Sequence, residues 1–208
     1  MNGTSFDAPS VGRILSKWLA GLAALAIVTT AAAQAQTTMY ANATTPLLAS
    51  AGGTAQGTVT PGTAVTVLDT SGADSHVQLE GWSMQGSDTV VFKGVGERIV
   101  LLVLNGDAKA DRKAGESKKD DYGSSWQQVT VTGWVATKDL ASSADAVWKA
   151  GQQVYDTRCS ACHSLHAPTE FTANQWPGIL KAMGKNASLD QADLDLVTRY
   201  LQAHAKGQ

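Results

Sequence analysis

The sequence has 208 residues and a formal net charge of −2, and charged residues make up only 16% of it. This balance predicts no general attraction to nucleic acid or to an anionic membrane surface, because both need an excess of basic residues. Glycine is frequent, at 20 residues, which favours a portion rich in strands and turns. The length allows one large or two small domains.

The first 35 residues have the pattern of an export signal. Arg13 and Lys17 precede an apolar run over 18–28, and residues 33–35 form an A-x-A cleavage site. An uncleaved membrane anchor is the alternative, but an anchor needs about 20 uninterrupted apolar residues and threonines break this run. We therefore expect a periplasmic protein, attached to the membrane only if the segment is retained.

Residues 36–56 are small and polar and indicate a linker or a first strand. Over 57–140, short segments with apolar residues at alternate positions are separated by glycine turns, which predicts several short strands. Residues 105–125 interrupt this pattern with five basic and five acidic side chains. They predict either a solvated loop or an arm that docks a partner, and the sequence leaves both open.

The stretch 57–140 resembles a bacterial SH3-like domain. The resemblance rests on Gly57, Val59 and Gly62, on the strand that follows them, and on the closing triplet at residues 133–135. It implies an all-β barrel with residues 105–125 as a long insertion.

Cys159, Cys162 and His163 form a C-x-x-C-H motif, which contains the only two cysteines in the sequence. The motif is the attachment signature of a c-type haem, with two thioether bonds and the imidazole as an axial iron ligand. A disulfide or a thioredoxin-like redox pair is the rival, but the latter needs a βαβ context that the sequence lacks. A zinc site would need further ligands at finger-like spacing. One motif predicts one covalently bound haem c.

The sixth iron ligand decides what such a haem can do. Met183 follows His163 by 20 residues and ends an apolar helical stripe, so it is the predicted distal ligand. An open or histidine-ligated iron remains the alternative. His166, three residues after His163, is expected at the surface or beside the iron ligands without binding the iron. The other residues that could act as ligands are expected to lie elsewhere: His204, His76, Met84 and Met39.

Three helices are predicted around the motif. The first is capped by Ser142, with Asp145 three residues later, and runs to about residue 156. Gly151 within it is a poor helix former that would permit close approach of another helix. The second follows a Thr172 capping box, with Phe171 packing on the helix start, and the third opens at Ser188.

Residues 142–208 resemble a small class I cytochrome c through Gly151, Tyr155 and the pair 200–201. The run from Phe171 to Met183 is similar to the C-terminal monohaem domain of pentahaem cytochromes that serve trimethylamine N-oxide reductases. The resemblance implies an all-α cytochrome c fold. The expected fold class is therefore two domains, an N-terminal all-β SH3-like barrel and a C-terminal all-α cytochrome c domain.

The predicted function is transport of single electrons to or from a redox protein, without enzymatic activity of its own. The family resemblance implies a molybdenum-containing S- or N-oxide reductase as the partner, although a dehydrogenase or an oxidase fits the residues equally well. Two alternatives remain open. One is a haem enzyme or gas sensor with an open sixth position, and the other is a binding module that tethers the haem domain.

Overall fold

The computed structural model describes residues 1, 3–5, 36–106 and 111–208, and almost all of the predicted export signal lies outside them. The chain divides into two units, Met1–Gln34 and Ala35–Gln208, and the second contains every strand and helix that the structure describes. Within the described residues, no helix has the length and apolar character needed to cross a membrane.

In the described part of the chain, ten strands, all paired in antiparallel fashion, make up one sheet in the order β10-β1-β4-β5-β6-β7-β3-β2-β9-β8. β5 also pairs with β9, from Asp74 opposite Ala136 to Met84 opposite Trp126, so the sheet closes on itself. The strands are β1 (Thr37–Ala41), β2 (Thr45–Leu48), β3 (Ala55–Val59), β4 (Ala64–Ser71), β5 (Asp74–Met84), β6 (Val90–Gly94), β7 (Glu97–Leu104), β8 (Asp111–Lys119), β9 (Ser125–Ala136) and β10 (Leu140–Ala141).

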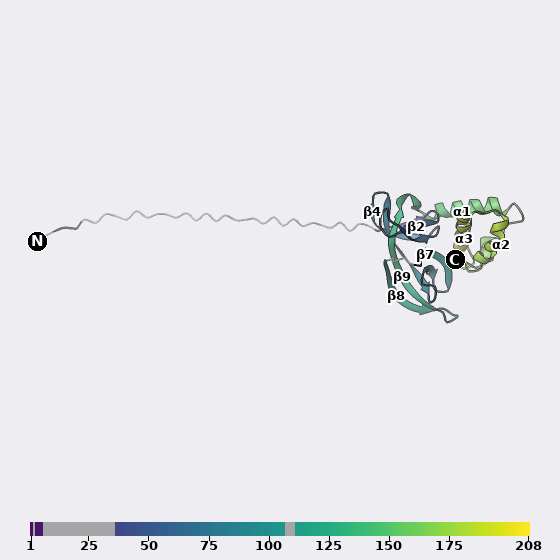
Figure 1. The fold of residues 1–208 in the computed structure, drawn as a ribbon, viewed down its shortest axis with the longest axis horizontal. Coiled ribbons are helices and arrows are strands. Elements are labelled where there is room, and N and C mark those ends of the chain that lie inside the picture. The colour runs from purple at the N-terminus through teal and green to yellow at the C-terminus, as the bar shows by residue number, and fades with distance from the viewer. Residues whose placement is uncertain (2, 6–35, 107–110) are drawn as a thin grey trace. The chain divides into compact units, whose positions relative to one another are not determined.

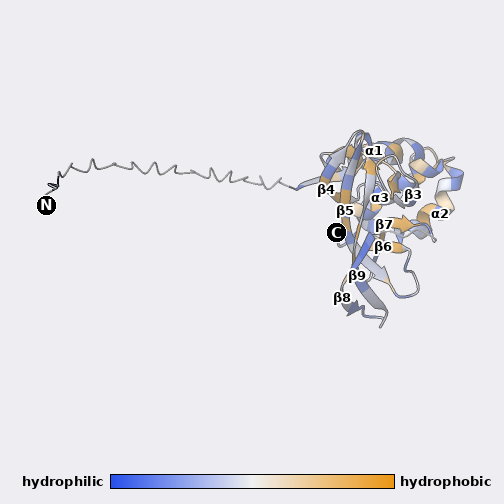
Figure 2. Cartoon of the chain, turned by 60° about the vertical axis from the view of Figure 1, so that its left-hand side comes forward, coloured by the Kyte–Doolittle hydropathy of each residue, from blue (hydrophilic) through white to orange (hydrophobic). Residues whose placement is uncertain are grey.

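The alternation of apolar and polar residues explains how these strands bury one face. Val77 and Leu79 of β5, and Val129 and Val131 of β9, are at most 2% exposed, while their neighbours along each strand face outward. Figure 2 shows the alternation as orange and blue segments along β4 and β5. Each such buried side chain contributes about 1.5–3 kcal/mol relative to full exposure.

Three α-helices follow the sheet in the sequence: α1 (Ala144–Cys159), α2 (Trp176–Asn186) and α3 (Gln191–Ala203). Two 3-10 turns, at Thr137–Asp139 and Pro168–Glu170, precede α1 and α2. Figure 1 shows the three helices grouped beside the sheet.

Three predicted helix caps are wrong. Thr172 does not cap α2, because Gln175 occupies the cap position and makes no side-chain capping hydrogen bond. The side chain of Gln175 accepts instead from the Thr172 backbone N–H at 2.9 Å. The side chain of Ser143, and not that of Ser142, accepts a hydrogen bond from the Asp145 backbone N–H at 3.1 Å. Asp190, and not Ser188, caps α3 through the Asp193 N–H at 2.8 Å. Both true caps have extended backbone angles, as a cap requires, whereas Ser188 has a φ of 52°.

The predicted fold class is wrong. The structure is mostly β-sheet, and the three helices do not form a separate all-α cytochrome fold beside a small SH3-like barrel, because sheet and helices make one compact unit. Ile99 of β7 is 1% exposed and belongs to the hydrophobic core of the helices, with Trp176, Val197 and Leu201. The helical core is therefore completed by a side chain from the sheet.

Polar contacts reinforce this junction. The side-chain amide of Asn174, just before α2, accepts from the Arg98 N–H and donates to the Gly96 carbonyl, both at 2.8 Å. It thereby replaces a strand partner at the end of β7. Arg199 of α3 donates from Nε to the carbonyl of Pro61 at 3.1 Å.

The charged segment, predicted to be either a solvated loop or an arm that docks a partner, contains strand β8, which pairs with β9 over most of its length. Its side chains are almost all exposed, so backbone hydrogen bonds rather than apolar burial hold it in place. Residues 107–110 of the predicted insertion lie outside the described part of the chain.

Gly62 lies at the closest approach of sheet and helices. It has a φ of +70°, and a Cβ added there would lie 1.9 Å from Cη2 of Trp148 on α1. Gly72 has a similar φ of +61°, yet nothing lies within 4 Å of the corresponding position. Comparing alanine substitutions at these two glycines therefore separates the cost of backbone strain from the cost of a steric clash with Trp148.

We predict that Gly72→Ala lowers the free energy of unfolding by about 1 kcal/mol through backbone strain alone. Gly62→Ala should lower it by roughly 1–3 kcal/mol more, because the indole of Trp148 must move. Urea denaturation of both variants, followed by circular dichroism, measures the difference. Equal losses would show that the contact between Trp148 and Gly62 contributes nothing to stability.

Candidate functional site

The C-terminal end of α1 positions the first cysteine of the C-x-x-C-H motif. Gly151, Tyr155 and Cys159 are spaced four residues apart and face the other helices, the first two being buried. A Cβ on Gly151 would lie 2.6 Å from the Cβ of Tyr200, so this glycine permits the close crossing of α1 and α3 that the sequence predicts. Close packing at Gly151 thus fixes where α1 ends.

Both cysteines are free thiols. Cys159 is half-buried, and burial raises the pKa of its thiol. Cys162 is exposed, in the turn that follows α1. Two unpaired thiols at this spacing are available for thioether bonds.

The motif opens onto a cavity of about 150 Å³. Cys159, Cys162 and His163 line it together with Leu180 and Met183 of α2. Leu180 is only 3% exposed, whereas Met183 is 36% exposed, which is unusual for the methionine of an apolar stripe. The structure thus brings all four residues singled out in the sequence to one cavity.

A backbone contact determines which nitrogen of His163 can bind a metal. Its Nδ1 lies 2.6 Å from the carbonyl oxygen of Ser164. Since a carbonyl can only accept, Nδ1 carries the proton and Nε2 keeps its lone pair. Metal-ligating histidines are commonly oriented by such a hydrogen bond from the second ring nitrogen.

His166 also lines this cavity. Its Nδ1 lies 2.9 Å from Oε2 of Glu170, and its ring is 5.6 Å from that of His163. His204 lies instead against Trp148 and Tyr200, away from the cavity lining. The remaining residues weighed as ligands lie in the sheet, on β1 and β5: Met39, His76 and Met84.

Two residues that sequence reasoning did not assign to the site hold its loop in place. The hydroxyl of Tyr155 donates to the carbonyl of His166 at 2.7 Å, and Nε1 of Trp176 donates to the carbonyl of Pro168 at 3.0 Å. Both side chains also line the cavity. The four-residue spacing of Tyr155 and Cys159 is the one sequence signal that could have placed Tyr155 there.

These residues fit a covalently bound haem. The cavity offers two free thiols, an imidazole with Nε2 available, a thioether sulfur and walls formed partly by Trp176 and Leu180. By contrast, residues 36–106 and 111–208 contain no group of three or more His, Cys, Asp or Glu side chains that could hold a bare metal ion. The donor set therefore suits a haem better than a zinc ion.

Sequence profiles of two cytochrome families match the chain. That of the TorC third cytochrome c domain matches residues 33–140, and that of dihaem cytochrome c matches residues 155–208. The stretch that resembles an SH3-like domain therefore falls within the TorC profile. No solved structure matches the chain.

Three curated relatives illustrate the similarity. Cytochrome c-type protein TorY of Escherichia coli O157:H7 is 38% identical over 72% of this chain and 41% of the relative. TorY of Haemophilus influenzae is 31% identical over 62% of this chain and 35% of the relative. Cytochrome c-type protein TorC of Escherichia coli K12 is 28% identical over 81% of this chain and 44% of the relative. The chain thus spans less than half the length of these proteins.

The phenol of Tyr155 generates a pH dependence. Burial, and then the nearby Cys159, raise its pKa from 10.0 to about 12. The unfolded chain therefore loses this proton at a lower pH than the folded chain does. The contribution of protonated Tyr155 to the free energy of unfolding is therefore complete below pH 10 and is lost as the pH rises towards 12.

We predict that Tyr155→Phe flattens the alkaline decline in stability, because the hydroxyl at position 155 is no longer present to ionise, although burial also raises the pKa of Tyr200. Urea denaturation at neutral pH and at intervals above pH 10 measures this. Tyr122→Phe is the matched control, since Tyr122 is 92% exposed. A decline that is as steep in Tyr155→Phe as in the unaltered protein would assign the alkaline transition to other groups.

Proposed function

The chain belongs to the family of the TorC third cytochrome c domain, and on that basis we propose that it carries single electrons through one haem c attached to Cys159 and Cys162. The observation that supports this most directly is the shared cavity, in which the cysteines, His163 and Met183 meet. One haem is proposed because the sequence contains a single C-x-x-C-H motif.

In this proposal each residue has a defined task. Cys159 and Cys162 supply the thioether bonds, Nε2 of His163 is the proximal iron ligand, and the sulfur of Met183 is the distal one. When bound, the haem supplies an iron that cycles between Fe(II) and Fe(III). A methionine–histidine pair favours a high reduction potential and closes the iron to other ligands.

The surrounding side chains keep the proximal ligand in place. The Ser164 carbonyl holds the proton on Nδ1 of His163, and the Tyr155 hydroxyl fixes the chain at His166. Trp176 and Leu180, 1% and 3% exposed, form a buried apolar part of the wall. A hydrophobic shell of this kind keeps water away from a metal centre and influences its reduction potential.

The proposed setting is the periplasm, where a redox protein exchanges electrons with the haem. We propose a molybdenum-containing S- or N-oxide reductase as that partner, and no chemical conversion by this chain itself. The similarity to TorC and TorY, both cytochrome c-type proteins, and the export-signal pattern of residues 1–35 support this proposal.

The proposal predicts a clear effect of removing the distal ligand. The oxidised protein should show a methionine–iron band at about 700 nm, and Met183→Ala should abolish it. The midpoint potential should fall by roughly 0.1 V or more, within the range of about 0.8 V that axial ligands span. Optical redox titration measures both quantities.

Met84→Ala is the matched control, because Met84 lies on β5 and outside the cavity lining. It should keep both the band and the potential. Rapid binding of carbon monoxide to the reduced, unaltered protein would contradict ligation by Met183. That result would favour a gas-binding or catalytic haem with an open sixth position.

A further inference from the structure

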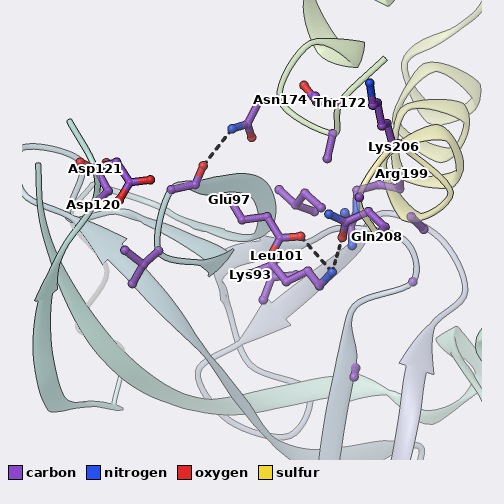
Figure 3. Close-up of a pocket in the computed structure, with 18 of the residues that line it drawn as sticks. Lys93, Glu97, Leu101, Asp120, Asp121, Thr172, Asn174, Arg199, Lys206 and Gln208 are labelled. Atoms are coloured by element: carbon purple, nitrogen blue, oxygen red, sulfur yellow. Dashed lines mark hydrogen bonds and ion pairs between the residues drawn. The ribbon is translucent and has the colours of Figure 1, made fainter. Parts of the chain in front are cut away.

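A second and larger cavity, of about 1070 Å³, lies between the sheet and the helices. No described residue lines both this cavity and the cavity of the C-x-x-C-H motif. Figure 3 shows side chains of the sheet, of the segment before α2 and of α3 around it. The proposed electron carrier gives this cavity no task.

Arg199 of α3 lines the cavity although it is only 6% exposed. A guanidinium has five N–H donors, and here Nε donates to the carbonyl of Pro61. Burial lowers the pKa of Arg199 to about 10, so the side chain stays charged at neutral pH. A buried cation is costly unless an anion compensates it.

The protein does not supply that anion within ion-pair distance. In the described part of the chain, no carboxylate lies within 4.0 Å of Arg199. Glu97 is close enough to favour the charged form of Arg199, but its Oε1 lies 3.0 Å from Nζ of Lys93. That carboxylate is therefore already paired.

A second acid of the lining is also engaged. Asp120 accepts hydrogen bonds from Nε1 of Trp126 and from the backbone N–H groups of Tyr122 and Ser124. These bonds lower the pKa of Asp120 and keep its carboxylate in its own turn. Glu80 and Asp121 are the other two acidic side chains of the lining, and neither forms an ion pair with Arg199. Arg199 therefore faces the cavity without a carboxylate at ion-pair distance among the described residues.

We propose that this cavity binds a small organic anion, whose carboxylate or phosphate group pairs with Arg199. Leu101, 9% exposed, and the half-buried Trp148 offer apolar surface for the rest of the ligand. Lys206, an exposed residue of the same lining, adds a second cation. The volume is slightly above the range of about 300–1,000 Å³ that is usual for small-molecule sites, and the rest of the lining is rich in charged side chains of both signs.

Isothermal titration calorimetry on the full-length haem-loaded protein tests the proposal. The probes are benzoate, phenyl phosphate and benzamide, the last being a neutral molecule of the same shape as benzoate. We expect one equivalent of benzoate or phenyl phosphate to bind. The affinity for benzamide should be lower by roughly tenfold or more. Binding of only one anion supports the proposal and identifies the head group.

Arg199→Gln should lower the affinity for the anion by roughly tenfold or more, because it removes the buried partner. Arg98→Gln makes the same change on an exposed arginine outside the lining and should have no effect. Lys206→Gln, at an exposed position, should weaken binding about threefold and serves if Arg199→Gln does not fold.

Three results would overturn the proposal. The first is equal affinity for benzoate and benzamide, and the second is unchanged affinity for the anion in the folded cavity variants. The third is failure of the unaltered protein to bind either anion, including the case in which it binds an acidic peptide instead. None of these results depends on how the iron is ligated, so the electron-carrier proposal is tested separately.

Discussion

The insertion of Ile99 from β7 into the core of the three helices is the contact on which the rest of the structure depends. About 65 residues bury too little apolar surface to be strongly stable alone, and here the sheet supplies the missing side chain. Trp148 on Gly62 and the amide of Asn174 at the end of β7 align the same surfaces. The wall of the haem-motif cavity therefore depends on the sheet, although no strand lines it.

Adjacent residues of helix α3 have different surroundings. Arg199 faces the large cavity, whereas Tyr200 packs against Gly151 and Tyr155 of α1. Tyr155 in turn reaches the loop that carries His166. α1 and α3 are in close contact at Gly151, on the helix that ends at Cys159.

Local patterns predicted the local features well. The alternation at residues 77–79 and 129–131, the close approach at Gly151 and the packing of Phe171 on Trp176 are all seen in the structure. The features that were missed depend on tertiary contacts. The apolar sequence of β7 does not show whether Ile99 packs in the core of the sheet or in that of the helices. The prediction of a separate all-α cytochrome fold was therefore wrong. β8 has no apolar alternation, because its backbone rather than its side chains pairs it with β9.

The site shows the same division between local and distant information. Cys159, Cys162 and His163 could be singled out because a covalent attachment constrains their spacing directly. The contacts of the Tyr155 hydroxyl and the burial of Arg199 could not be predicted, because each depends on where a distant part of the backbone passes. The contact of His163 with the Ser164 carbonyl could not be predicted either, because it depends on the local backbone conformation.

The exposure of side chains near the site also affects how a partner protein would contact it. Leu165, in the loop after His163, and Met183 are each 36% exposed, and among the described residues 142–208 they are the large apolar side chains that are exposed. Small contact areas are typical of short-lived redox complexes, and a carrier must release its partner after each electron.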